Sequence, residues 1–158
     1  VSKMLIKSLI IIFLIILVAV LLILTYIKRK RITKAATIVR NASETIVNNA
    51  MIQVAKQLKM DGMEFDGAKG KSVADVWGQS VVGFNYHANL KHSMDINLIE
   101  SKINKILAEY CRKHQLEDED GPQLKVSDIW LNQNHLELDV VYLINRQTKD
   151  YLNDLSKL

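Results

Sequence analysis

The sequence predicts an α+β protein. We expect an N-terminal transmembrane helix that continues into a long amphipathic helix, followed by a small, mainly antiparallel sheet covered by a helix. Three observations support this class: an uncharged apolar run near the N-terminus, apolar positions repeating every three or four residues after it, and alternating apolar and polar positions further on. At 158 residues, the chain has room for one modest domain beside an anchor.

These patterns divide the chain into five expected segments. A short tail, a membrane span and a basic run leading into an amphipathic helix come first, and a loop and a small α+β domain come after them. Their limits are residues 1–7, 8–27, 28–60, 61–78 and 79–158.

The membrane span is predicted from the residues between Ser8 and Ile27, which carry no charge. Within them, Leu9 to Leu24 is an unbroken run of aliphatic residues and Phe. Twenty helical residues extend about 30 Å, the thickness of the hydrocarbon layer. A cleavable signal peptide would have a shorter apolar core followed by small residues, whereas Tyr26 and a run of cations follow here.

The charges are distributed unevenly. Residues 1–34 hold seven of the 21 Lys and Arg residues and no acid, which leaves 14 basic and 17 acidic residues for the rest of the chain. The predicted domain is therefore mildly acidic, which argues against a nucleic-acid partner. The basic run instead predicts contact with lipid headgroups. We expect the membrane interface to be formed by Tyr26, Lys28, Arg29, Lys30 and Arg31.

Two signals conflict over the side of the membrane on which the domain lies. The five cations at 28–31 and 34 outnumber Lys3, Lys7 and the terminal amine, which favours a cytoplasmic domain. A short N-terminal tail with its own two Lys residues is, in contrast, typical of an anchor that exports the domain behind it. Both sides stay open for this single-pass protein, and the expectation leans to the extracytoplasmic side.

Beyond the cations, apolar positions form one stripe of a helix that runs to about Met60. Together with the anchor it predicts one helix of about 55 residues, on the order of 80 Å long. The stripe can pack against its own domain, the favoured alternative, or against other subunits, copies of the same chain included. We expect the candidate partner face to consist of Ile38, Ala42, Ile46 and Ala50.

The domain is predicted as a strand, a helix and a hairpin. Alternation places the strand at residues 82–90, and a 3.6-residue period places a helix from about Asp95 to His114, with Asp95 or Asn97 as its cap. The hairpin joins arms at 124–131 and 135–144, with a bulge near Asp128. In its second arm we expect Leu136, Leu138, Val140, Tyr142 and Ile144 to be buried, and His135, Glu137 and Asp139 to face water. A short helix from Gln147 is expected to dock on the domain.

The sequence predicts no catalytic, cofactor-binding or metal-binding residues, and hence no enzyme. Gly70-Lys71-Ser72 lacks the earlier glycine and the leading strand of a phosphate loop, and the acidic loop 117–122 lacks the ligand pattern of an EF-hand. Cys111 and His114 could share a helix face, but neither a zinc set nor a positioned base accompanies them. A lone cysteine allows no intrachain disulfide, which fits the cytosol without excluding export.

The architecture resembles that of type IV pilin-like and TadE-like subunits. The resemblance is carried by two consecutive segments of the first 60 residues, LIIIFLIILVAVLLILTYI and KAATIVRNASETIVNNAMIQVAKQL, with a small antiparallel sheet after them. It implies a non-enzymatic subunit of a pilus or secretion machine that is anchored in the membrane until it is assembled. Type IV pilins carry Glu at the fifth mature position, where this chain has Leu5, so no functional residue is carried over.

Two functions are therefore expected from the sequence. The first is a structural or assembly subunit of a membrane machine of the pilus, secretion or conjugation type, suggested by the long anchor helix and the small domain. The alternative is a membrane-tethered scaffold or adaptor on the cytoplasmic face, suggested by the basic run and the single cysteine.

Overall fold

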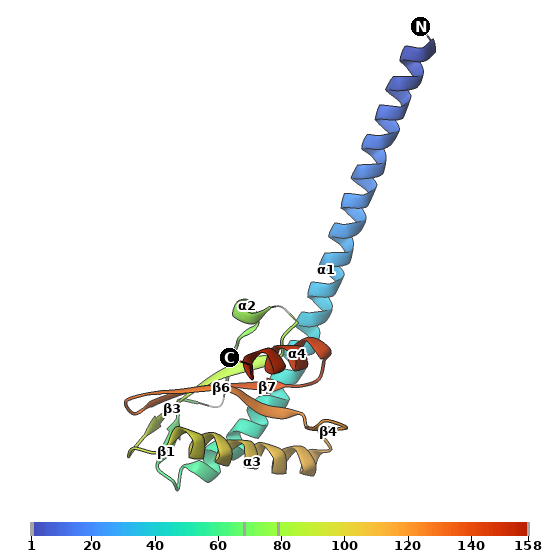
Figure 1. Ribbon diagram of the computed structural model, residues 1–158. Helices are drawn as coiled ribbons and strands as arrows, with labels where there is room; N and C mark the ends of the chain where they lie inside the picture. The colour runs from blue at the N-terminus through green and yellow to red at the C-terminus, as the bar shows by residue number, and fades with distance from the viewer. Residues whose placement is uncertain (1, 68, 79, 158) are drawn as a thin grey trace. The chain divides into compact units, whose positions relative to one another are not determined.

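The computed structural model describes residues 2–67, 69–78 and 80–157, and the protein has the expected α+β fold (Figure 1). A single helix, α1, runs from Ser2 to Leu58. The chain separates into two compact units, one ending at Ala36 and the other beginning at Thr37. The described residues of the first unit are all helical, whereas the second unit combines the remainder of α1 with the strands of the described chain.

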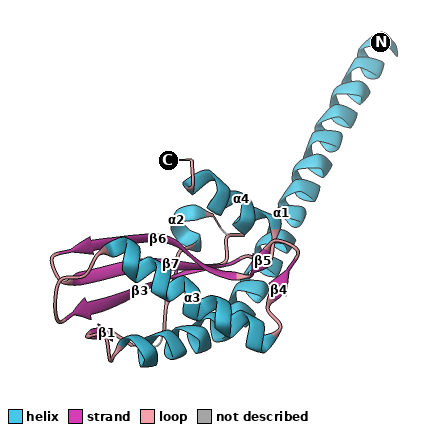
Figure 2. Ribbon diagram, turned by 60° about the horizontal axis from the view of Figure 1, so that its bottom comes forward, coloured by secondary structure: helices cyan, strands magenta, loops and turns pink. Residues whose placement is uncertain are grey.

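An antiparallel sheet organises the second unit. Its strands follow the order β1-β3-β7-β6, and β2 pairs with the other half of β3. Two further strands form a small separate ribbon, and three helices complete the unit (Figure 2). The strands are β1 (Met63–Phe65), β2 (Lys71–Ser72), β3 (Gly83–Leu90), β4 (Glu117–Asp118), β5 (Gly121–Pro122), β6 (Leu124–Asn132) and β7 (His135–Tyr142); the helices are α2 (Ala74–Trp77), α3 (Ile96–His114) and α4 (Arg146–Leu155).

Local sequence signals account for the main elements. The Asp95 carboxylate accepts hydrogen bonds from the backbone N–H groups of Asn97 and Leu98, at 2.8 and 3.1 Å, which confirms it as the cap of α3. The predicted strand, helix and hairpin are all present. The expected bulge is confirmed as well, because the pairing of β6 with β7 shifts between Val126 and Asp128.

The main core lies on one face of the sheet, which the last turns of α1 and the buried side of α3 both cover. In α1 the buried positions recur every three or four residues, the spacing of one helix face. The helix residues in this core are Val47, Ala50, Met51, Val54 and Leu58 of α1, and Ile99, Ile103, Ile106, Leu107, Tyr110 and Cys111 of α3. The structure thus confirms that α3 covers the sheet and adds α1 as a second cover.

A polar contact fixes α1 against the sheet within this core. The Asn48 side-chain oxygen accepts hydrogen bonds from the Tyr86 hydroxyl at 2.7 Å and from the Gly70 backbone N–H at 3.0 Å. Glycine is required at 70 because a Cβ atom there would lie 2.5 Å from the Tyr86 ring. One amide therefore joins α1, β3 and the segment that leads into β2.

The opposite face of the sheet is covered at one end by α2 and α4 (Figure 1). Asn145 caps α4 by accepting from the Thr148 backbone N–H at 2.8 Å, and its amide donates to the Ser80 carbonyl. Thr148 is fully buried and its hydroxyl accepts from the Val82 N–H at 3.0 Å. The sequence prediction of a docked terminal helix is therefore confirmed.

Several details differ from the sequence prediction. The expected loops at 61–78 and 117–122 contain the short strands β1, β2, β4 and β5. Such strands have two or three residues, too few to show alternation. Ile144 was expected inside but is 45% exposed, because β7 ends at Tyr142 and the chain then turns away.

Asp139 is also placed differently from the prediction. It was expected to face water but is only 4% exposed. The alternation assigned it correctly to the face opposite the main core. It could not show that the α4 end of that face is itself covered.

We predict that Ile103→Asp unfolds the second unit. Ile103 has no exposed surface, so the substitution buries an unpaired carboxylate at a cost of about 4 kcal/mol or more. Both tryptophans, Trp77 and Trp130, lie in this unit, so a fluorescence melt of the detergent-solubilised chain reports its unfolding.

The matched control is Leu98→Asp on the same helix, where the side chain is 50% exposed. It should retain a cooperative melt close to that of the unmodified chain. A cooperative melt for Ile103→Asp as well would show that α3 does not pack as described.

Candidate functional site

The expected interface residues lie on exposed turns of α1. Tyr26 is 67% exposed, and the four cations of 28–31 are exposed too. Because successive helical residues are about 100° apart, four consecutive cations encircle the helix. The preceding turns hold a candidate membrane span: an 18-residue window has a mean hydropathy of 3.4 and none of it is buried. This arrangement suits a helix that leaves an apolar layer at Tyr26.

The structure divides the candidate partner face. Ile38 is 60% exposed and Ala42 is exposed, whereas Ile46 is half-buried against the core. Ala50 has no exposed surface, so its inclusion in the partner face was wrong. The physical reason is that the stripe turns gradually into the domain core. Only its first part, Ile38 and Ala42, remains available.

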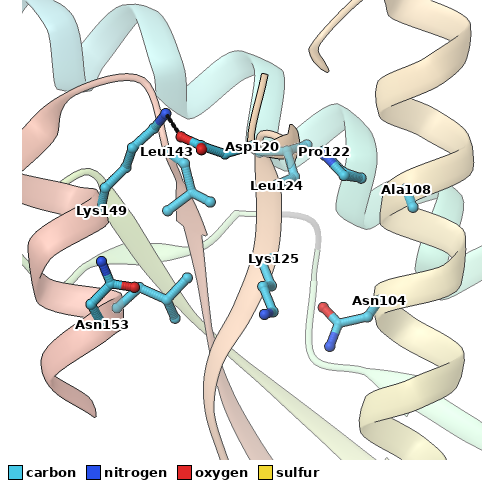
Figure 3. A pocket seen from close by; sticks show the side chains of 10 residues that line it. Asn104, Ala108, Asp120, Pro122, Leu124, Lys125, Leu143, Lys149 and Asn153 are labelled. Carbon is cyan, nitrogen blue, oxygen red and sulfur yellow. Dashed lines mark hydrogen bonds and ion pairs between the residues drawn. The ribbon is translucent and has the colours of Figure 1, made fainter. Parts of the chain in front are cut away.

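A cleft opens between α3, β6 and α4 (Figure 3). Its volume is about 530 Å³, and its walls include Leu124, Leu143 and Leu152 together with the amides of Asn104 and Asn153. Asn104 is already engaged, since its side-chain oxygen accepts from the Val126 N–H of β6 at 2.9 Å. That bond also protects part of the outer edge of β6. The cleft therefore offers an apolar recess beside an occupied strand edge.

An ion-pair cluster closes one end of this cleft (Figure 3). The Lys149 ammonium of α4 donates to Asp118 at 2.8 Å and to Asp120 at 2.6 Å. These hydrogen bonds raise the pKa of Lys149, and the same lysine lowers the pKa of Asp118. Lys149 therefore stays charged and holds the acidic β4–β5 ribbon against α4.

The uncovered half of the second sheet face is polar. At its centre Glu137 accepts hydrogen bonds from the Trp130 indole N–H at 3.1 Å and from the Asn85 amide at 3.3 Å. The His87 ring nitrogen Nδ1 lies 4.0 Å from the same carboxylate. Because the Glu137 carboxylate already accepts two hydrogen bonds, it is part of a structural network on this face.

Next to this network lies Asp139, whose carboxylate accepts from the Asn85 amide at 2.7 Å. Burial raises the pKa of Asp139, the Asn85 hydrogen bond opposes that change, and the nearby charges of Asp128 and Glu137 raise it further. Burial and the Asp139 charge together raise the pKa of Tyr151 to about 12. The contact between α4 and the sheet thus contains an acid whose charge is disfavoured by its surroundings.

The residues that the sequence offered as candidates for catalysis, metal binding or phosphate binding do not lie together in the structure. Cys111 is buried in the core, and burial raises the pKa of its thiol. His114 stacks on Tyr110 with ring centroids 4.2 Å apart. Lys71 and Ser72 form β2 and pair with β3, a strand and not a phosphate loop. Within residues 2–67, 69–78 and 80–157, no three His, Cys, Asp or Glu side chains gather as metal ligands.

Comparison with known proteins gives no match to any protein-family model, curated protein or solved structure. The function must therefore be inferred from the chain's own surfaces. Sequence reasoning did not find the cleft or the polar face, because both depend on where α4 docks. The periodicity of residues 147–158 signalled a docking helix but not the strands that it contacts.

We predict that Asp139→Asn stabilises the second unit at neutral pH. Because the pKa of Asp139 is raised in the folded state, its carboxyl stabilises the fold fully when the pH is below the unfolded-state pKa, near 3.8. This stabilisation is lost as the pH rises through the folded-state pKa. At pH 7 the variant should be more stable by roughly 1 kcal/mol, and the difference should vanish toward pH 3.

The measurement is the tryptophan fluorescence melt as a function of pH. Asp150→Asn provides the control, because Asp150 is an exposed acid on α4 whose ion pair with Arg146 is also exposed. It should change the melt little at any pH. Loss of stability in Asp139→Asn at pH 7 would contradict the assignment, since it would mean that the buried charge is favourable.

Proposed function

We propose that the chain is a non-enzymatic, membrane-anchored structural or assembly subunit of a multiprotein membrane machine. The observation that carries the proposal is the change of environment along α1. An all-round apolar segment gives way to a ring of cations, then to exposed apolar positions such as Ile38, and then to the fully buried Val47 and Val54. A helix that served only to connect an anchor to a domain would not need apolar side chains in water.

The exposed stretch is suited to packing against another helix. Ala42 allows close approach of a neighbouring backbone, and the adjacent Ile38 and Val39 supply apolar surface, 60% and 37% exposed. Helices in lipid gain no hydrophobic energy from association, so contacts just outside the bilayer carry more of the stability of an assembly. The partners are membrane lipid and other protein subunits, copies of this chain among them. The pilin-like and TadE-like resemblance of the first 60 residues supports the same class.

The second candidate is a membrane-tethered scaffold on the cytoplasmic face. The basic run at 28–31 favours that side, and a single reduced cysteine is compatible with it. The main proposal takes the domain to be extracytoplasmic. Topology therefore separates the two.

We predict that a photo-crosslinker placed at Ala42 captures a second subunit in native membranes. Ala42 is exposed on the part of α1 that remains outside the domain core, so a neighbour packed there lies within reach. Leu98, half-exposed on α3, is the control position. Equal crosslinking at the two positions, or capture only within the chain, would remove the assembly proposal and leave a simple tether.

Topology is tested by Glu119→Cys labelled with an impermeant thiol reagent on intact cells. Glu119 is exposed in the β4–β5 ribbon, whereas the native Cys111 is buried, so labelling reports the introduced thiol. We expect labelling of intact cells. Labelling only after the membrane is opened would support the cytoplasmic scaffold instead.

A further inference from the structure

Strand β1 leaves one edge of the sheet open. It pairs only with β3, and the Lys91 N–H donates to the Gly62 carbonyl while the Asp66 N–H donates to that of His87. In an antiparallel pair, alternate residues point their backbone groups the other way, so Met63 and Phe65 direct theirs outward. Within the described part of the chain these outward groups have no hydrogen-bond partner. Met63 is only 1% exposed, so the accessible part of this edge is the half-buried Phe65, where an extended segment can pair.

A groove runs beside this edge, between β1 and the last turns of α1. We define the edge groove by Ile52, Lys56, Lys59, Met63, Glu64 and Phe65, which together with Ala55 and Gly67 enclose about 530 Å³. Ile52 is 37% exposed and Phe65 is half-buried, so its floor is apolar and open to solvent.

The groove carries excess positive charge. Lys56, in the last turn of α1, and Lys59, which directly follows the helix, are both exposed and both line the groove. Neither has an ion-pair partner among the described residues. Glu64, the acid among the lining residues, is bound at 2.8 Å by Lys91, which lies outside the groove, so the two lysines leave an excess of positive charge. The groove thus combines an open strand edge, an apolar floor and two exposed cations, a combination that suits an extended acidic segment.

The chain itself contains such a segment. We define the acidic arm as residues 117–120, Glu-Asp-Glu-Asp, which begin in β4 and lead to β5. Lys149 holds Asp118 and Asp120 in place, while Glu117 and Glu119 are exposed and make no ion pair within the described residues. Because the arm is already held in shape, little ordering entropy is lost when it binds.

The groove and the arm of one chain cannot meet. β1 and β4 lie at opposite ends of α3 in both views (Figures 1 and 2). With 19 residues, α3 is about 28 Å long. The partner with this arm must therefore be another molecule.

We propose that the edge groove of one copy receives the acidic arm of a second copy. Such a contact is heterologous, since different surfaces meet, and repetition produces an open row of subunits and not a closed pair. The contact is small, but anchoring in one membrane raises the effective concentration of neighbours. This inference rests on the proposed assembly function and specifies its partner.

The test uses cysteine crosslinking of the full chain in native membranes. Two differently tagged copies are coexpressed, one with Lys56→Cys and one with Glu119→Cys, and then mildly oxidised. We expect the mixed dimer but no dimer from either variant alone, and a ladder of higher species when one chain carries both changes. The control pairs Leu98→Cys with Glu119→Cys, because Leu98 lies outside the groove.

Charge reversal tests the recognition itself. Adding Lys59→Glu to the Lys56→Cys chain should lower the yield of mixed dimer roughly fivefold, the effect of losing one exposed ion pair. Adding Glu117→Lys to the Glu119→Cys chain should restore it. A merely disturbed fold would not be rescued by a change on the other copy.

Three results would overturn the proposal. They are a yield no higher than that of the control pair, dimers from Lys56→Cys alone, and crosslinking of the groove only to a different protein. Photo-crosslinking at Ala42 does not involve the groove, so it distinguishes failure of this contact from failure of the assembly function as a whole.

Discussion

The packing of the last turns of α1 beneath the sheet is the constraint on which the rest of the second unit depends. Val47, Ala50 and Val54 have no exposed surface, and Asn48 among them accepts hydrogen bonds from Tyr86 and Gly70. An apolar face alone would permit small rotations of the helix. The half-buried Asn48 amide selects one rotation, because any other leaves its two donors unsatisfied. The position of Ile38 and Ala42 on the outer face results from that choice.

The same constraint explains how far sequence reasoning could go. The long apolar N-terminal helix, the strand at 82–90, the capped helix and the hairpin with its bulge were all predictable, because each has a local pattern or a local cap. The division of the α1 stripe was not. Ala42 and Ala50 are the same residue type and differ only in their surroundings. The sheet packs over Ala50 and leaves Ala42 exposed, and a helical period cannot show where the sheet lies. Of the candidate partner face, Ile38 and Ala42 are therefore exposed, whereas Ala50 is buried in the core.

The second face of the sheet shows the same limit of prediction from sequence. The alternation of β7 correctly put Asp139 opposite Leu138, but a two-residue period assigns a face and not its solvent exposure. Its burial results from α4, whose docking depends on Asn145 and Thr148 contacting residues 80 and 82, far away in sequence. Likewise, β1 has only three residues and was unpredictable as a strand, although its open edge is the main feature of the edge groove.

The two edges of the sheet differ in how many of their outward backbone groups have a hydrogen-bond partner. On the side of β6, Asn104 occupies the Val126 N–H, and the Asp128 carboxylate accepts from the Ile129 N–H, so that edge is partly protected against further pairing. On the side of β1, a strand of three residues, no side chain of the described residues is hydrogen-bonded to the outward backbone groups of Met63 and Phe65, and two lysines stand beside that edge. Natural sheets tend to protect edges that must not pair with other chains. Because the two edges of this sheet are protected differently, they are not equivalent surfaces. If the proposed membrane-anchored assembly is correct, a surface that differs between the two edges would favour ordered rows of subunits over random contacts.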